Sequence, residues 1–311
     1  MSNKLIIRLS NEMGNQMFMY ASAFAFSKKM SRDFLIDDET AFLTRKNLSQ
    51  YRLGEFNFSA RRAPKSLKFL GYRGYLKRKF LKKMDTFRKA KKFYIEKKSK
   101  DKITTFDDNF LSREYGENLF IEGYFESEKY FYQFQKEIQQ EFTFKNLKIF
   151  LNNPYYKEIR DSNSVSICIR QNRFSEKLRR IKNSDIIKSK IFTDEQIKYV
   201  KKCIEIMKSK IRKPKFFLWS NDYKGLYEYF PKNEFTFVDN DKFISKDKKS
   251  ALDLFLMTQA KNHIVIPSSF NWWGSWLSMS RGKIVLRPSD KNFTNFRINN
   301  RDLWPESWIE I

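Results

Sequence analysis

The sequence predicts an α/β protein made of two Rossmann-like domains that face a central cleft. Short apolar runs with the length of buried strands alternate with longer helical patterns along the chain. This alternation stops near Asn152-Asn153-Pro154 and then begins again, which indicates a domain boundary there. The 311 residues suffice for two domains of ordinary size, which we place at residues 1–155 and 156–311.

The N-terminal half opens with a strand, a turn and a helix. Residues 5–9 form a short apolar run, residues 10–14 a turn, and residues 15–30 a helical pattern that is apolar on nearly every side. A helix of that kind packs closely on a sheet. With a second strand predicted at 34–36, the opening is a β-α-β unit, typical of a parallel sheet. A strand at 119–124 and a helix over 126–144 complete this half.

The C-terminal half repeats the alternation more regularly. Strands are predicted at 164–170, 215–219, 235–238, 264–266 and 283–286, and helices at 193–207, 224–230, 250–260 and 271–280. A strand-helix order of this length predicts a second parallel sheet with helices on its faces.

The net charge of +26 is concentrated in one segment. Residues 61–102 hold 18 Lys and Arg against 3 acidic residues, with aromatic residues spaced among them. We interpret the segment as a helical insertion with a solvated positive face. The alternative is a patch that contacts anionic lipid headgroups or a phosphorylated lipid-linked acceptor. The pI of about 9.8 also suggests a second alternative, a nucleic-acid-binding protein. The charge lies outside the predicted cleft and no nucleic-acid motif is present, so we expect no nucleic-acid partner.

Cysteine and histidine usage restricts the chemistry and the compartment. Cys168 and Cys203 form no disulfide framework, which fits a reducing compartment. We see no signal peptide and no apolar stretch of the ~18–20 residues that a membrane crossing needs. We therefore expect a cytoplasmic protein, peripheral at most at the inner face of the membrane. His263 is the only histidine, which argues against His-based triads and His-rich metal sites, and a structural role is predicted for it.

Four loops that follow predicted strands carry residues suited to binding a nucleotide diphosphate. Gly14, Asn15 and Gln16 open a helix whose N-terminal N–H groups can accept an anion. Arg170, at the end of VSICIR, offers a fork of donors that suits a diphosphate. A serine or aspartate at a strand end is often only a helix cap, so each loop alone is a weak signal.

The other two loops extend the same pattern. Asn221 and Asp222 follow FLWS, and the Asp222 carboxylate can accept two hydrogen bonds from the N1–H and 2-amino edge of guanine. Ser268, Ser269 and Phe270 follow IVIP at a strand-to-helix turn that can seat an anion.

Six segments in colinear order resemble the bacterial α-1,2-fucosyltransferases of glycosyltransferase family 11. They are MGNQMFMYA (13–21), YRLGEFNF (51–58), GYFESEKYF (123–131), VSICIR (165–170), FLWSND (217–222) and DLFLMTQAKNHIVIPSSFNWWGSWL (253–277). The resemblance implies a GT-B fold, with an N-terminal acceptor-side domain and a C-terminal domain that binds the GDP-sugar. It also implies transfer of L-fucose from GDP-fucose to a galactose hydroxyl of a glycan or lipid-linked oligosaccharide, with inversion. No cofactor and no essential metal are implied.

The resemblance carries over to individual residues only in part. Arg170 matches the first arginine of the family run His-x-Arg-Arg-Gly-Asp and is implied to be the pyrophosphate ligand. The other named positions of that run differ in 168–173, where only Arg173 adds a second positive charge. Asp222 matches the acidic position that reads guanine in related fucosyltransferases, and 268–270 match the phosphate-binding turn. Two alternatives stay open: another GDP-deoxyhexose as donor, and a member that binds the donor without catalysis.

The general base stays open among four carboxylates of the N-terminal half. Glu126, Glu122, Asp37 and Glu12 lie at predicted strand ends or turns. An inverting transfer benefits from a carboxylate near the acceptor hydroxyl, and no spacing selects one of them. We assign the role to Glu126, together with Arg170 as the residue that stabilises the leaving group, as the catalytic hypothesis to be tested.

Overall fold

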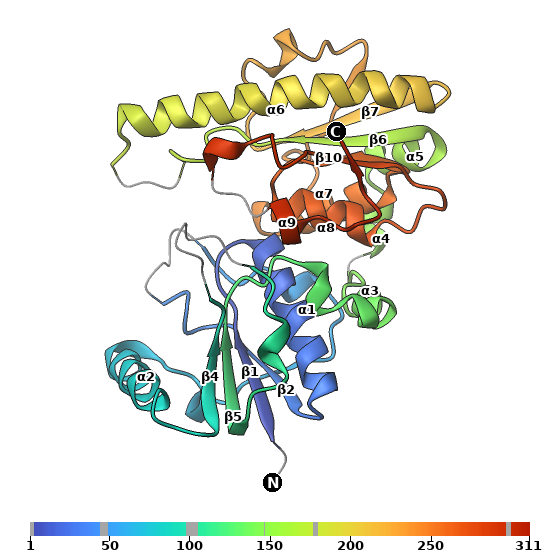
Figure 1. The fold of residues 1–311 in the computed structure, drawn as a ribbon. Coiled ribbons are helices and arrows are strands. Elements are labelled where there is room, and N and C mark those ends of the chain that lie inside the picture. Colours follow the sequence, from blue (N-terminus) through green and yellow to red (C-terminus); the bar gives the residue numbers. More distant parts are fainter. Residues whose placement is uncertain (1–2, 44–48, 98–104, 146, 177–179, 297–299) are drawn as a thin grey trace. The chain divides into compact units, whose positions relative to one another are not determined.

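The computed structural model describes residues 3–43, 49–97, 105–145, 147–176, 180–296 and 300–311 (Figure 1). The chain divides into two compact units. Unit 1 contains Met1–Lys145 and Arg301–Pro305, and unit 2 contains Asn146–Asn300 and Glu306–Ile311.

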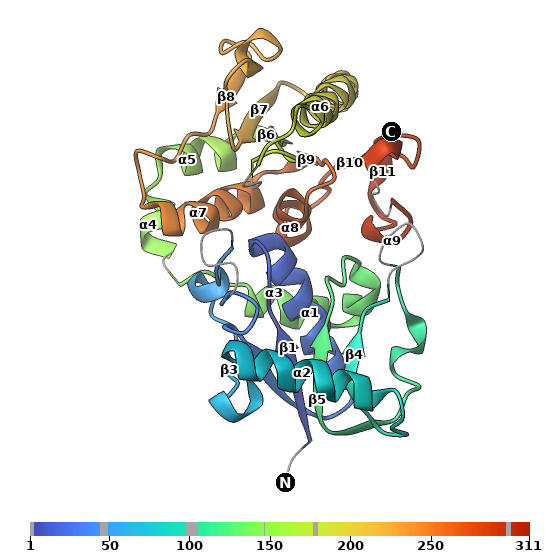
Figure 2. The same cartoon turned by 90° about the vertical axis from the view of Figure 1, so that its left-hand side faces the viewer.

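Unit 1 is built on a five-stranded parallel sheet in the order β3-β2-β1-β5-β4. α1 covers one face of this sheet and α2 covers the opposite face (Figures 1 and 2). The elements are β1 (Lys4–Arg8), α1 (Met13–Lys29), β2 (Asp33–Asp37), β3 (Arg61–Arg62), α2 (Gly71–Asp85), β4 (Lys91–Ile95), β5 (Tyr115–Glu122) and α3 (Gln135–Glu141).

The core of unit 1 lies mainly on the α1 side of the sheet. Residues 16–27 of α1 are all buried, which confirms the prediction made from its all-round apolar pattern. Aromatic side chains fill the space around it; the Phe26 and Phe110 rings, for example, stack with their centroids 3.9 Å apart. The α2 side has a much smaller cluster around Ile6, Leu35 and Ala63. The two faces of this sheet are therefore covered very unequally.

Two predictions for unit 1 are wrong in part. The segment 61–102 is not only a helical insertion, because it also contributes both edge strands of the sheet, β3 and β4. Edge strands are often short and charged, and the arginines of β3 and the lysines of β4 hide the alternation that would reveal a strand. The predicted helix over 126–144 is broken into two 3-10 turns, Glu128–Tyr130 and Tyr132–Phe134, followed by α3. Phe131 interrupts it with φ −137° and ψ 0°.

Unit 2 is built on a six-stranded parallel sheet in the order β11-β10-β9-β6-β7-β8. α6 lies on one face, and α7 and α8 lie on the other (Figures 1 and 2). The elements are α4 (Leu147–Leu151), α5 (Pro154–Asp161), β6 (Asn163–Ile169), α6 (Asn183–Lys210), β7 (Pro214–Ser220), β8 (Phe235–Phe237), α7 (Lys246–Gln259), β9 (Asn262–Ile264), α8 (Ser269–Leu277), β10 (Val285–Arg287), α9 (Asn300–Leu303) and β11 (Ile309–Glu310). The predicted class, α/β with two Rossmann-like units, is confirmed.

The chain passes from unit 1 to unit 2 at residues 145–146, before the predicted break at Asn152-Asn153-Pro154. That break is a helix start: the Asn153 side chain accepts a hydrogen bond from the Tyr155 N–H, and Pro154 is the first residue of α5. Proline suits this position because the first turn of a helix needs no N–H donor. In unit 2, α6 starts well before the predicted residue 193, the predicted helix 224–230 is a 3-10 turn, and β11 was not predicted.

Candidate active site

The strand order of unit 2 brings three of the predicted loops to one edge of the sheet. β6 lies between β9 and β7, and all three strands are parallel, so their carboxyl ends point the same way. Arg170 follows β6, Asn221-Asp222 follow β7, and the Ser268–Phe270 turn follows β9 at the start of α8. Ligands of open parallel sheets bind outside the carboxyl ends of the strands. The sheet thus gathers every predicted site residue of this unit.

Arg170 is fixed through its backbone by a buried side chain of α6. The carboxamide of Gln196, which is fully buried, accepts a hydrogen bond from the Arg170 N–H at 2.8 Å. Its Nε2 donates to the Arg170 carbonyl at 2.9 Å. The Arg170 side chain is 35% exposed, and its guanidinium forms an ion pair with Glu176. The backbone is therefore held rigidly, while the guanidinium stays near the surface, where an anion can reach it.

The loops after β6 and β7 are tied together by side-chain amides. The Gln171 N–H donates to Oδ1 of Asn221 at 2.9 Å, and Nδ2 of Asn221 donates to the Gln171 carbonyl at 3.1 Å. Nε2 of Gln171 donates to the Asp222 carbonyl at 2.6 Å. Asn221, predicted as a donor-binding residue, therefore uses its amide to brace the two loops.

Asp222 is half-buried, and among the described residues only one of its carboxylate oxygens accepts a hydrogen bond. Oδ1 accepts a hydrogen bond from the Lys224 N–H at 2.9 Å, as in an ordinary turn cap. Oδ2 has no hydrogen bond to any described residue. The carboxylate is therefore a turn cap that keeps one oxygen available to a ligand.

The turn after β9 is shaped by Asn271 and Arg173. Oδ1 of the buried Asn271 accepts a hydrogen bond from the Ile266 N–H at 2.8 Å. Arg173 donates to the Pro267 carbonyl at 2.5 Å, and its guanidinium lies over the Phe192 ring at 4.8 Å. Arg173 thus connects the loop after β6 to the turn that opens α8, and this contact orients the backbone of Ser268.

The tryptophans of α8 and His263 belong to the core of unit 2. Trp272 and Trp273 are fully buried, with ring centroids 4.9 Å apart. His263 is fully buried in β9, where its Nδ1 lies 2.7 Å from the Ser166 hydroxyl. Burial, with a smaller effect of Lys283, lowers the His263 pKa to about 3, so the ring is neutral near pH 7. The structural role predicted for His263 is confirmed.

In unit 1 the predicted residues also meet at strand ends, because β1 and β5 are neighbours. Nδ2 of Asn15 donates to Oε1 of Glu126 at 2.8 Å, so α1 and the loop after β5 are joined at this point. Gln16 is fully buried, and its amide donates to the carbonyls of Asn11 and Gln50 at 2.6 and 2.8 Å. Gly14 is buried beside it in the first turn of α1. Gln16 therefore positions this loop from inside the protein.

Two of the other three candidate carboxylates, Glu122 and Asp37, are engaged in holding the fold. Glu122 is buried and forms ion pairs with Arg8, Arg78 and Lys82. Burial alone would raise its pKa, but the hydrogen bond from Arg78 and the surrounding positive charges lower it to about 2, which makes a weak base. Oδ1 of Asp37 accepts the N–H groups of two residues in the turn after β2. Glu126, which is half-buried in the loop after β5, and Glu12, which precedes α1, are the two candidates left, and the base role of Glu126 stays a prediction.

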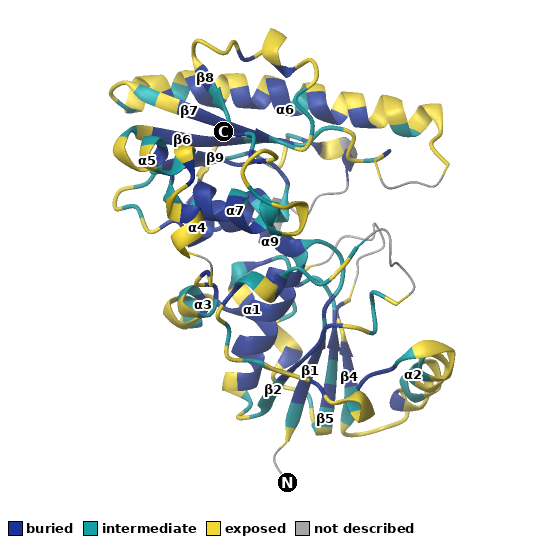
Figure 3. Cartoon of the chain, turned by 180° about the vertical axis from the view of Figure 1, so that it is seen from behind, coloured by how far each residue is buried: buried dark blue, intermediate teal, exposed yellow. Residues whose placement is uncertain are grey.

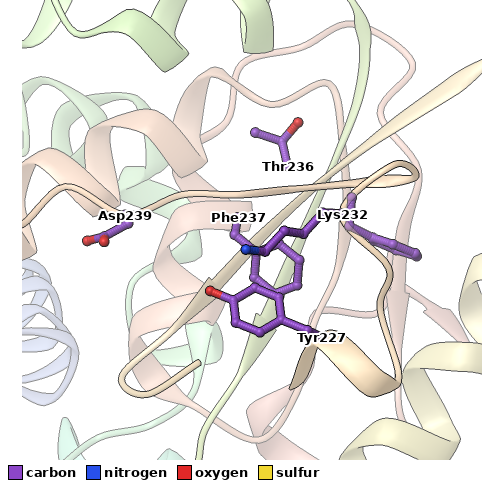
Figure 4. A pocket seen from close by; sticks show the side chains of 6 residues that line it. Tyr227, Lys232, Thr236, Phe237 and Asp239 are labelled. Atoms are coloured by element: carbon purple, nitrogen blue, oxygen red, sulfur yellow. The ribbon is translucent and has the colours of Figure 1, made fainter. Parts of the chain in front are cut away.

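Two further features bear on ligands. A cavity of about 400 Å³ lies beside β8, lined by Tyr227, Lys232, Phe235, Thr236, Phe237 and Asp239 (Figure 4). It contains none of the predicted donor-binding residues, and Nζ of Lys232 lies 4.2 Å from the centroid of the Tyr227 ring.

Among the described residues, no three His, Cys, Asp or Glu side chains gather in a way that could hold a metal ion.

Sequence reasoning missed Gln196, although a signal was present. The core-facing side of α6 carries Phe192, Val200 and Cys203 at helical spacing, and Gln196 occupies a position on the same side. A polar residue on an apolar helix face needs a buried hydrogen-bond partner. That partner is the Arg170 backbone.

Comparison with known proteins defines first the fold and then the family. The fold matches that of two solved fucosyltransferases of the GT-B type. NodZ from Bradyrhizobium matches with a TM-score of 0.51 and 14% identity over 88% of this chain and 92% of NodZ. FUT1 from Arabidopsis thaliana matches with a TM-score of 0.51 and 11% identity over 98% of this chain and 75% of FUT1. The model of glycosyl transferase family 11 matches residues 76–311, so the chain belongs to this family.

Two relatives from Escherichia coli align along almost their whole length. An alpha-1,2-colitosyltransferase is 27% identical over 99% of this chain and 98% of its own. The O-antigen biosynthesis glycosyltransferase WbnK is 27% identical over 97% of this chain and 99% of its own. The predicted family is confirmed, and the protein is a glycosyltransferase.

Proposed function

We propose that this glycosyltransferase moves L-fucose from GDP-fucose to a galactose hydroxyl, forming an α-1,2 linkage with inversion, on a surface glycan or lipid-linked oligosaccharide. The observation that carries the proposal is the arrangement of Arg170, Asp222 and the Ser268–Ser269 turn at the carboxyl ends of three adjacent strands. A NodZ α-1,6-fucosyltransferase of the same fold was studied as crystals soaked with GDP-fucose, and FUT1 was solved with GDP.

Each group has a role that its chemistry supports. The Asp222 carboxylate accepts hydrogen bonds from the guanine edge. As the sugar leaves, negative charge grows on the β-phosphate, and Arg170 with the turn that opens α8 stabilises it. Glu126 takes the proton of the acceptor hydroxyl, which attacks from the opposite face. Because cationic and N–H donors replace a divalent ion, we propose that no metal is needed, and EDTA should leave the transfer rate unchanged.

The donor class is tested by a thermal-shift screen against GDP, UDP, ADP and CMP. We expect a rise in Tm with GDP alone, because ligand binding to the native state stabilises it and Asp222 selects guanine. Asp222→Asn should abolish the preference, because the amide oxygen would stay on the Lys224 N–H and the NH2 group in place of Oδ2 can only donate. Equal shifts with all four nucleotides, or none with GDP, would contradict the donor assignment.

The leaving-group role is tested by Arg170→Ala, which should lower the transfer rate by a factor on the order of 10²–10³. Glu176→Gln is the matched control, because it removes the ion-pair partner of Arg170 and leaves the guanidinium in place. We expect this control to keep most of the activity. Near-normal turnover of Arg170→Ala would show that another group stabilises the diphosphate.

A second donor is favoured by one comparison. The colitosyltransferase relative acts, by its name, on colitose, which is also a deoxyhexose. We therefore propose another GDP-deoxyhexose as the alternative donor. Offering a panel of GDP-sugars and measuring which one is transferred separates the two. Binding of a GDP-sugar with no product in a single-turnover assay would instead identify a member of the family that no longer catalyses.

A further inference from the structure

Helix α2 exposes apolar side chains to solvent, which is the opposite of the usual orientation of an amphipathic surface helix. Tyr72, Leu76, Phe80 and Met84 recur at every fourth position and are 75%, 45%, 62% and 41% exposed. Residues four apart lie on the same side of a helix, so these side chains form one row, which we call the apolar row. Figure 3 shows α2 largely in the colour of exposed residues, in contrast to α1.

The inner side of α2 is attached to the sheet by charges. Arg78 donates to Glu122 of β5, and Nζ of Lys82 donates to the same carboxylate at 2.5 Å. At the end of the helix, the buried Asp85 accepts the backbone N–H groups of Lys92 and Phe93 at 2.7 and 3.0 Å. Asp85 is the only buried residue of the helix. A surface helix normally buries its apolar face, so the exposed apolar row has no role in holding α2 on unit 1.

The outer side of α2 also carries positive charge. Arg73, Lys77, Lys79 and Lys83 are all exposed, and none forms an ion pair with a described residue. The one acidic residue of the helix, Asp85, is on the inner side. The inner cations Arg78 and Lys82 form ion pairs with Glu122, and the outer four form none with a described residue. The apolar row is therefore flanked by uncompensated cations.

We propose that the outer side of α2 binds the surface of an anionic lipid bilayer. The helix lies in the plane of the interface, the apolar row enters the headgroup region, and the four outer cations contact lipid phosphates. The described part of the chain contains no helix with the length and apolar character that a bilayer crossing requires, so this contact is peripheral. Such a membrane contact would hold the enzyme beside a lipid-linked acceptor. The proposal of this contact does not depend on the identity of the donor sugar.

The combination of apolar and basic side chains selects this partner over two others. A second copy of the same face would set four cations against four cations, which opposes self-association. A nucleic acid would use the cations and could stack bases on Tyr72 and Phe80, but it offers no apolar partner to Leu76 and Met84, which are 45% and 41% exposed. A bilayer surface satisfies both kinds of side chain at once.

The test is flotation of the full chain with vesicles of phosphatidylcholine alone or of equal parts phosphatidylcholine and phosphatidylglycerol. We expect binding only to the anionic vesicles, weakened by salt. Because each basic residue near an anionic surface contributes roughly fivefold to binding, Lys79→Glu with Lys83→Glu should reduce it by at least about 25-fold. Phe80→Ser should also weaken binding, by about fivefold to tenfold, through lost apolar burial.

Matched controls keep the result specific. Lys198→Glu with Lys202→Glu makes the same charge change at the same spacing on exposed positions of α6. Tyr132→Ser removes an aromatic ring of exposure similar to Phe80, 59% against 62%. Both controls should bind like the parent, and Tm should be unchanged in all variants. Absence of binding to anionic vesicles, α2 variants that bind like their controls, or variants that instead lose self-association or DNA binding would each overturn the proposal. The assay contains no nucleotide, so it is independent of the proposed transfer.

Discussion

Replacing Gln196 by leucine tests whether the buried amide positions the site. Leucine has nearly the volume of glutamine, so the helix packing of α6 stays intact while the two hydrogen bonds to Arg170, at 2.8 and 2.9 Å, are lost. An unsatisfied buried backbone group costs about 1–3 kcal/mol. Two such groups would lower the free energy of unfolding by roughly 2–6 kcal/mol, unless the loop moves so that water can reach them.

Loop movement has its own consequence, because it displaces the Arg170 guanidinium. A shift of about 1 Å in a positioning group can cost around 10²-fold in rate. We therefore expect Gln196→Leu to lower either the unfolding free energy in urea or kcat for sugar transfer, with acceptor KM little changed.

The control is Gln259→Leu on α7; within the described part of the chain the Gln259 amide donates only to Thr258 Oγ1, at 2.9 Å. It should change stability by less than about 0.5 kcal/mol. If Gln196→Leu matched this control in both stability and kcat, the buried amide would not be what holds Arg170.

Four further predictions follow from the packing and the charges. Glu122→Gln leaves Arg8, Arg78 and Lys82 without their counter-charge and should lower the unfolding free energy by about 3–5 kcal/mol in urea titrations at pH 7. In the parent protein the Glu122 pKa is lowered to about 2. The ionised Glu122 therefore contributes on the order of 3 kcal/mol to the free energy of unfolding above pH 4.5, and this contribution is lost as the pH falls toward 2. An acid titration of Glu122→Gln should lack this loss of stability. Burial raises the Asp253 pKa to about 6 even though Asn240 donates to it, so stability should fall as pH rises from 4 to 6, and Asp253→Asn should remove that fall and add roughly 1–3 kcal/mol at pH 7. Gly274→Ala would place a methyl group 2.8 Å from Cβ of Met257 and should lower Tm through a loss of about 1–3 kcal/mol, whereas an unchanged Tm would mean that α7 and α8 can separate.

The sequence alone determined the alternation of strands and helices, the two Rossmann-like units and the family. These follow from local patterns. A short apolar run indicates a parallel strand that is buried on both faces, and a helix that is apolar on all sides, such as α1, indicates a helix surrounded by other parts of the protein. The loops after β6, β7 and β9 were found for the same reason. In a parallel sheet, the position of a strand in the sequence already says where its carboxyl end leads.

The tertiary structure decided which distant groups meet. Gln196 reaches the Arg170 backbone, Asn221 joins two loops, and Arg173 reaches Pro267, over separations of 26, 50 and 94 residues. No periodicity records such contacts, because they depend on the strand order. The edge strands β3 and β4 escaped prediction because an edge needs little apolar character. The sequence also could not predict which side of α2 faces solvent. Its pattern gives the spacing of the apolar residues, but the ion pairs of Arg78 and Lys82 with Glu122 decide which side faces the sheet.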